Sequence, residues 1–118
     1  MDLTTKLQIK PGQRLTILAE GEVPEVAPGD VTMVDTPRDA DAIVAFVRNR
    51  TDLDAFATPA IEAAKDDRLA WIAYPKAGQL GTDLNRDSLK AVLAGRGVQP
   101  VRQISIDEVW SALRFRPA

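Results

Sequence analysis

The chain contains neither cysteine nor histidine, and these absences exclude several kinds of chemistry. Without cysteine there is no disulfide and no thiolate metal site, and without histidine the remaining metal ligands are carboxylates. A Ser-His-Asp hydrolase is excluded because its serine needs a histidine as the general base. Acid–base catalysis near neutral pH would have to use other side chains. We therefore expect no metal site.

A long apolar run and a strong net charge are also missing. No stretch approaches the ~18 consecutive apolar residues of a membrane span, and residues 1–10 lack the apolar run of a signal peptide. The 15 basic and 17 acidic residues are interspersed and leave a formal charge of −2. We therefore expect a cytoplasmic protein that binds neither nucleic acid nor membranes. Three arginines, Arg102, Arg114 and Arg116, make the C-terminal segment locally basic. We interpret them as solvent-facing residues at the edge of a sheet.

The apolar content is sufficient for one core. The 118 residues are 45% hydrophobic, and a domain of this length typically buries roughly two thirds of the surface that its unfolded chain exposes. We predict a single domain over residues 1–118.

Short apolar runs between turn residues predict four strands, at residues 14–19, 31–35, 42–47 and 69–74. The last two runs are apolar at every position, which is typical of strands buried on both faces of a parallel sheet. The segment between the first two strands contains two prolines and two glycines. It therefore has room for at most one helical turn, near residues 22–26.

Capping residues predict two helices. Thr51 is predicted to be the N-cap of the first helix, because acidic residues follow it in the first turn. Pro59 is predicted to begin the helix again, because proline is tolerated at the first position of a helix. Asn85 caps the second helix, where Leu84 and Leu89 occupy the positions of a hydrophobic staple. One of two later glycines ends this helix.

The segment at residues 105–116 fits two structures. Ser105 and Glu108 have the spacing of a capping box and precede apolar residues at helical spacing, whereas residues 113–116 alternate like a half-exposed strand. We favour a hairpin, with strands at 101–106 and 111–116. The predicted class is α/β, a small Rossmann-like sandwich with a mainly parallel sheet and a C-terminal antiparallel hairpin.

Three motifs carry a resemblance to known proteins: W-x-A-Y-P-K at residues 71–76, T-D-L-N-R-D at 82–87 and S-I-D-E-V-W-S-A-L-R-F-R at 105–116. They resemble an uncharacterised family of short bacterial proteins, catalogued only as a domain of unknown function. The predicted order of strand, helix, strand, helix and hairpin is also similar to the second half of a class I methyltransferase-like Rossmann fold. The first resemblance implies a fold rather than an activity, because that family has no assigned activity.

The carboxyl ends of parallel strands meet at one edge of a sheet, where open α/β proteins hold their ligands. Lys76 precedes a glycine-bearing loop that could offer backbone N–H groups to an anion, and Trp110 could stack on a ring. Asp35, after the second strand, lies where a ribose-binding acid would lie. The candidate ligand or partner residues at this edge, called here the predicted rim, are Arg48, Tyr74, Lys76, Asp83, Arg86, Asp107 and Trp110.

A methyltransferase would bind S-adenosylmethionine on a glycine-rich turn after its first strand. Here the turn at residues 18–24 has one glycine and then a proline, and residues 20–30 are few for a parallel crossover. We therefore expect no cofactor, and interpret the chain as a non-catalytic domain that acts through a protein partner or a small ligand at the predicted rim. Two alternatives stay open. One is a reduced methyltransferase-like enzyme completed by homo-oligomerisation, and the other is a structural or regulatory subunit that associates through its C-terminal edge.

The degraded glycine turn predicts that the chain does not bind S-adenosylmethionine measurably. An isothermal titration of the protein with this compound should give no heat of binding beyond dilution. A fitted dissociation constant in the micromolar range would overturn the prediction.

Overall fold

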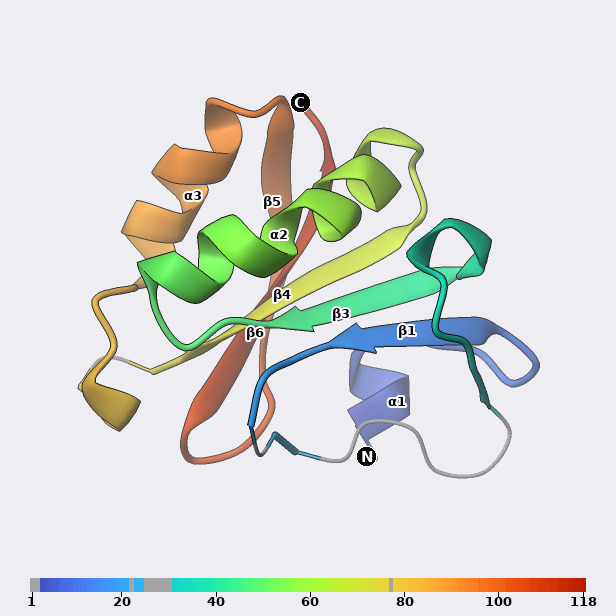
Figure 1. The fold of residues 1–118 in the computed structure, drawn as a ribbon, viewed down its shortest axis with the longest axis horizontal. Coiled ribbons are helices and arrows are strands. Elements are labelled where there is room, and N and C mark those ends of the chain that lie inside the picture. The colour runs from blue at the N-terminus through green and yellow to red at the C-terminus, as the bar shows by residue number, and fades with distance from the viewer. Residues whose placement is uncertain (1–2, 22, 25–30, 77) are drawn as a thin grey trace.

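The structure is a computed structural model that describes residues 3–21, 23–24, 31–76 and 78–118. The fold is mixed α/β, with a six-stranded sheet (Figure 1). In chain order the elements are α1 (Leu3–Lys6), β1 (Arg14–Leu18), β2 (Thr32–Met33), η1 (Pro37–Asp39), β3 (Ala42–Phe46), α2 (Arg50–Lys65), β4 (Leu69–Pro75), η2 (Gln79–Gly81), α3 (Arg86–Ala94), β5 (Val98–Ser105) and β6 (Trp110–Pro117).

The strand order across the sheet is β2-β1-β3-β4-β6-β5. β2, β1, β3 and β4 are parallel, and β6 lies antiparallel between β4 and β5. The predicted C-terminal hairpin is confirmed, and the alternative helix over residues 105–116 is wrong. Leu113 and Phe115 are buried on one side of β6, as its alternating pattern indicates.

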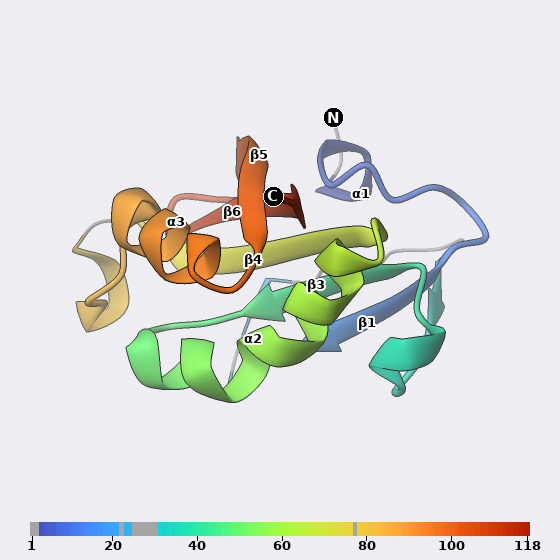
Figure 2. The same cartoon turned by 90° about the horizontal axis from the view of Figure 1, so that it is seen from above.

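Both faces of the central strands β3 and β4 are buried. α2 and α3 cover one face, and α1 lies against the other (Figure 2). Ile43 and Ile72 belong to the core beneath α2 and α3. Val44 and Trp71 belong to the second core, together with Leu7 from the segment after α1. This two-sided burial explains why both strands are apolar at every position.

α2 differs from its prediction at its start and its middle. Asn49 is the N-cap in place of Thr51, because its extended backbone lets the side chain accept a hydrogen bond from Asp52 N. Pro59 lies inside one continuous 16-residue helix and does not begin a second one. Pro59 has no backbone N–H, so the helix loses one hydrogen bond at this position. The helix continues because it buries a long apolar stripe, which includes Leu53 and Ile61, against the sheet.

The outer strands also differ from their predicted bounds. β2 is only Thr32–Met33, because it pairs with β1 at just two positions on the edge of the sheet. β5 begins at Val98, earlier than predicted, because its pairing with β6 continues through a register shift between Pro100 and Arg102. Most of the helical turn predicted near residues 22–26 lies outside the described residues.

α3 begins as its sequence predicts. Asn85 and Ser88 form a reciprocal capping box, and both staple residues, Leu84 and Leu89, are buried in the core beneath α2 and α3. The helix is capped at its end by Gly95. No helix within the described ranges is long and apolar enough to cross a membrane.

Phe115→Ala should lower the free energy of unfolding by ~3–5 kcal/mol, because it removes a fully buried ring from the core. Val101→Ala is the matched control on the neighbouring strand, and should change stability by less than about 0.5 kcal/mol because Val101 is exposed. Urea denaturation followed by tryptophan fluorescence measures both values. Equal losses in the two variants would contradict this assignment of the hairpin faces.

Candidate functional site

The carboxyl ends of the parallel strands lie at one end of the sheet, together with the β5–β6 turn. An ion pair of 3.5 Å joins Glu20, after β1, to Arg48, after β3. Lys76, after β4, donates its backbone N–H to the Val109 carbonyl in the hairpin turn at 2.7 Å. The chain therefore gathers these segments at one edge, where their side chains form two separate clusters.

The first cluster lies where the order of the strands reverses. From β1 the chain passes to β2 on one side, and the strands that follow are added on the other side, beginning with β3. Open α/β sheets bind their ligands outside the carboxyl ends of the strands at such a switch point, here β1 and β3. Glu20 and Gly21 lie two and three residues after the end of β1, and Arg48 lies two residues after the end of β3.

Arg48 is held on one side by Asp52, the most buried acid of the cluster. Its Nε donates to Asp52 Oδ2 at 2.7 Å and its Nη2 to Asp52 Oδ1 at 3.3 Å, while its backbone N–H donates to Oδ2 at 3.0 Å. Asp52 is only 5% exposed. The guanidinium hydrogen bond lowers the pKa of Asp52 although burial opposes this, so the carboxylate stays ionised. The same bond raises the pKa of Arg48.

Asp83 belongs to this first cluster and not to the Lys76 loop. Its Oδ1 accepts the Arg50 backbone N–H at 2.9 Å, so a carboxylate from a distant loop lies at the N-terminus of α2. Negative charge is stabilised there by the unpaired N–H groups and the helix dipole. Asp83 thus ties the segment before α3 to the start of α2.

The second cluster surrounds Lys76 and the hairpin turn. Lys76 Nζ donates to Ser105 Oγ at 2.8 Å. Asp107 Oδ1 accepts the backbone N–H groups of Val109 and Trp110 at 2.8 and 2.7 Å, which closes the turn between β5 and β6. Asp107 therefore forms the turn in this structure. Lys76 lies close to this turn because Ser105 is hydrogen-bonded to both Lys76 and Asp107.

Both aromatic residues of the predicted rim are buried, on opposite faces of the sheet. Trp110 is 4% exposed and makes an edge-to-face contact with Phe46, with ring centroids 5.2 Å apart. We expected that Trp110 could stack on a ligand, but its ring is not exposed for stacking, because it packs in the core on the α1 side. Tyr74 lies in the other core, and burial raises the pKa of its hydroxyl. Arg86 is exposed on the first turn of α3.

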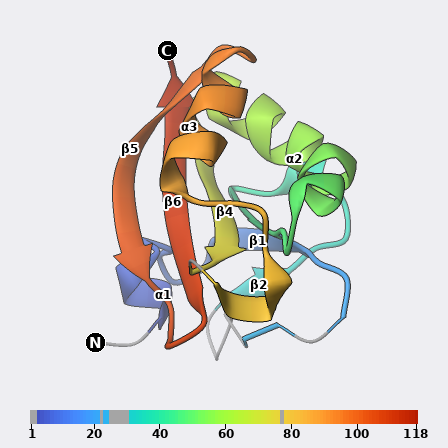
Figure 3. The ribbon, with the colours of Figure 1, turned by 90° about the vertical axis from the view of Figure 1, so that its left-hand side faces the viewer.

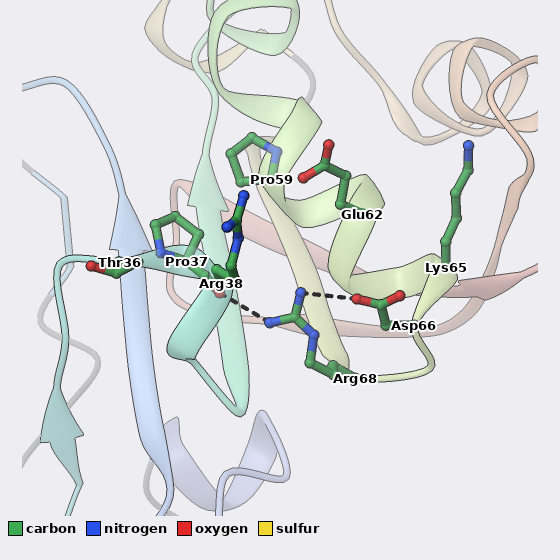
Figure 4. A pocket seen from close by; sticks show the side chains of 8 residues that line it. All are labelled: Thr36, Pro37, Arg38, Pro59, Glu62, Lys65, Asp66 and Arg68. Carbon is green, nitrogen blue, oxygen red and sulfur yellow. Dashed lines mark hydrogen bonds and ion pairs between the residues drawn. The ribbon is translucent and has the colours of Figure 1, made fainter.

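The structure also contains a hollow that sequence patterns do not indicate. A cavity of about 600 Å³ lies between η1 and the second half of α2, and Figure 4 shows the side chains around it. It lies at the amino ends of β3 and β4, away from the predicted rim. Arg68 closes one side, donating from its Nη1 to the carbonyls of Pro37 and Ala40 at 2.9 and 2.8 Å. The remaining lining mixes both charges, including Arg38, Glu62 and Lys65, which gives the cavity no preference for one ionic class.

Comparisons with known proteins add no assignment. No protein-family model matches the chain, and no curated protein matches it either. The resemblance of residues 71–76, 82–87 and 105–116 to an uncharacterised family stays a prediction. Within the described residues, no three acidic side chains come together as a metal site.

Asp52→Asn should lower the free energy of unfolding at neutral pH by ~1–2 kcal/mol, because it weakens a buried charged hydrogen bond. The folded pKa of Asp52 lies below the unfolded value, near 3.9, so its contribution is full above about pH 4 and is lost as pH falls through the folded pKa. The difference between wild type and variant should therefore shrink in acid.

Asp54→Asn is the matched control for this measurement, since Asp54 pairs with Arg50 at the same spacing but on the exposed side of α2. Its effect should stay near 0–1 kcal/mol. Urea denaturation of the three proteins at pH 7 and at about pH 3 makes the comparison. A wild-type advantage over Asp52→Asn that is unchanged in acid would contradict the role given to Asp52.

Proposed function

We propose that this chain is a small-ligand-binding domain without catalysis of its own, and that it binds an anionic ligand at the carboxyl ends of β1 and β3. The observation that carries the proposal is the geometry of Arg48. Asp52 holds the Nε side of its guanidinium, yet the side chain remains 39% exposed. Arg48 is thus a fixed cation that faces solvent at the position where open α/β sheets bind ligands.

The other contacts of Arg48 are weak or absent. Glu20 approaches Nη2 at 3.5 Å, but its side chain is 68% exposed, so solvent screens this pair strongly. Nη1 makes no hydrogen bond within the described part of the chain. Gly21 lies beside Nη1, since a Cβ added there would make an ordinary van der Waals contact with this nitrogen at 3.8 Å. A carboxylate or phosphate would take the place of Glu20 and bind Arg48 through Nη1 and Nη2.

Binding without catalysis is favoured by the state of the remaining polar groups. Asp52 and Asp83 are committed to the start of α2, and Asp107 is committed to the hairpin turn. Tyr74 has a raised pKa and lies in a core, so it is a poor base near neutral pH. The described rim therefore supports recognition of charge better than proton transfer.

A reduced methyltransferase-like enzyme is the second candidate. The order β3, α2, β4, α3 and hairpin is the order on which that resemblance rests. Asp35, two residues after β2, lies at the same end of the sheet as Gly21. An adenosyl ligand would need a glycine turn and a ribose-binding acid at this end. This candidate requires S-adenosylmethionine to bind and the ligand-binding proposal does not, so one screen separates them.

A thermal-shift screen should include phosphate, small di- and tricarboxylates, nucleotides and adenosyl compounds. A ligand present at 100 times its dissociation constant adds about 2.7 kcal/mol of stability, which is readily seen as a higher melting temperature. We expect stabilisation by at least one small anion. Glu20→Gln should tighten its binding several-fold, because the variant removes the carboxylate that competes for Arg48.

Arg48→Met should abolish the same binding. Because this variant also leaves Asp52 without its guanidinium partner, Arg50→Met serves as the control, and it should bind like wild type. The proposal fails if no anion stabilises the protein at millimolar concentration, or if Glu20→Gln weakens binding. Stabilisation by adenosyl compounds alone would favour the methyltransferase-like candidate.

A further inference from the structure

The second outer edge of the sheet is β5, and in the described part of the chain no strand pairs with its outer side (Figure 3). Two hollows, of about 300 and 250 Å³, flank this strand. Val101 lines both of them, so the two hollows meet at the edge of β5. We call the strand and the residues lining these hollows the β5 edge.

The β5 edge is basic although the whole chain is acidic. Arg86 and Lys90 from α3, and Arg102 from β5, line the larger hollow, and none of their side chains makes an ion pair or hydrogen bond among the described residues. Arg102 also lies directly opposite Arg114 on β6. Like charges in such cross-strand positions repel, but Arg114 itself points to the α1 side, where its Nη1 donates to Gln8 Oε1 at 2.8 Å, and it does not line the larger hollow.

Among the described residues that line the two hollows, the one acidic side chain is already paired with an arginine. Asp67 accepts two hydrogen bonds from Arg116, at 2.9 and 3.1 Å, and this contact lowers the pKa of Asp67. Arg86, Lys90 and Arg102 thus line the larger hollow without an acidic residue among the described residues of its lining, in a chain whose formal charge is −2. The sequence indicated only Arg102, Arg114 and Arg116, because the cations of α3 join them through the fold alone.

An exposed apolar residue lies at the centre of these charges. The register shift between Pro100 and Arg102 leaves Val101 without a partner on β6, and Val101 is 49% exposed. The bulge and Pro100 also prevent a second strand from pairing along the full length of β5. A partner would therefore be recognised mainly by its side chains, with an apolar anchor on Val101 and acidic groups around it.

We propose that the β5 edge binds an extended acidic segment of a partner protein, which places carboxylates against Arg86, Lys90 and Arg102 and an apolar side chain on Val101. A nucleic acid fits less well, because the nearby aromatic residues Tyr74, Trp110 and Phe115 are buried and give no platform on which bases could stack. The β5 edge contains no residue of the Arg48 cluster, so this proposal is independent of the ligand proposed there.

The probe is an acetylated nonapeptide, Glu-Asp-Glu-Asp-Leu-Glu-Asp-Glu-Asp, added to the ¹⁵N-labelled full chain. Amide chemical-shift changes should concentrate in β5 and α3, and binding should weaken as salt is added. The double variant Arg86→Gln/Arg102→Gln should weaken the peptide by roughly tenfold or more. The control double variant Lys10→Gln/Arg38→Gln removes the same charge near the opposite edge and should bind like wild type.

A double-mutant cycle tests the apolar anchor. Val101→Ser in the protein and leucine-to-serine in the peptide should each weaken binding, and their effects should not add, because they remove the same contact. Equal weakening by both double variants, shift changes outside the β5 edge, or additive effects in the cycle would overturn the proposal. It would also fail if single-stranded oligonucleotide displaced the peptide, or if sedimentation showed that the β5 edge is covered by a second copy of the chain.

Discussion

The parallel pairing of β3 with β4 is the constraint on which the rest of the structure depends. The two strands are in register from Ala42 with Leu69 to Phe46 with Ala73, and the residues of this pair are almost all buried. Two buried faces need two covers, which α2 and α3 provide on one side and the α1 segment on the other. The parallel direction also requires a crossover, and α2 is that crossover. Its N-terminus therefore begins at the carboxyl end of β3.

The candidate site follows from this arrangement and not from a motif. Because α2 starts two residues after Arg48, the side chain of Asp52 in its first turn can reach back to the guanidinium. The same helix start accepts Asp83 from the segment that follows β4. One helix terminus thus fixes a cation at the surface and anchors a loop. The carboxylates of Asp52 and Asp83 are therefore positioned by backbone N–H groups as well as by charged side chains.

The sequence predicts the elements whose signals are local. The continuous apolar runs identify β3 and β4, and the alternation around Phe115 identifies β6. Asn85 with the staple residues Leu84 and Leu89 marks the start of α3. It misplaces the start of α2, because Asn49 and Thr51 are both good caps and only the structure shows that the Asn49 side chain accepts the Asp52 backbone N–H. The sequence also predicts that the rim residues lie at the carboxyl ends of the parallel strands. The partners within it are not, since Asp83 and Arg50 are 33 residues apart in the sequence.

The position of β6 has a consequence for biosynthesis. β6 is the sixth strand in the chain but lies inside the sheet, against the buried strand β4. While the ribosome has not yet released residues 110–117, the nascent chain exposes the edge of β4, an apolar strand without a charge to repel a second chain. Folding is therefore completed late, and the interval before β6 inserts is the period when chaperone binding or aggregation would compete with it.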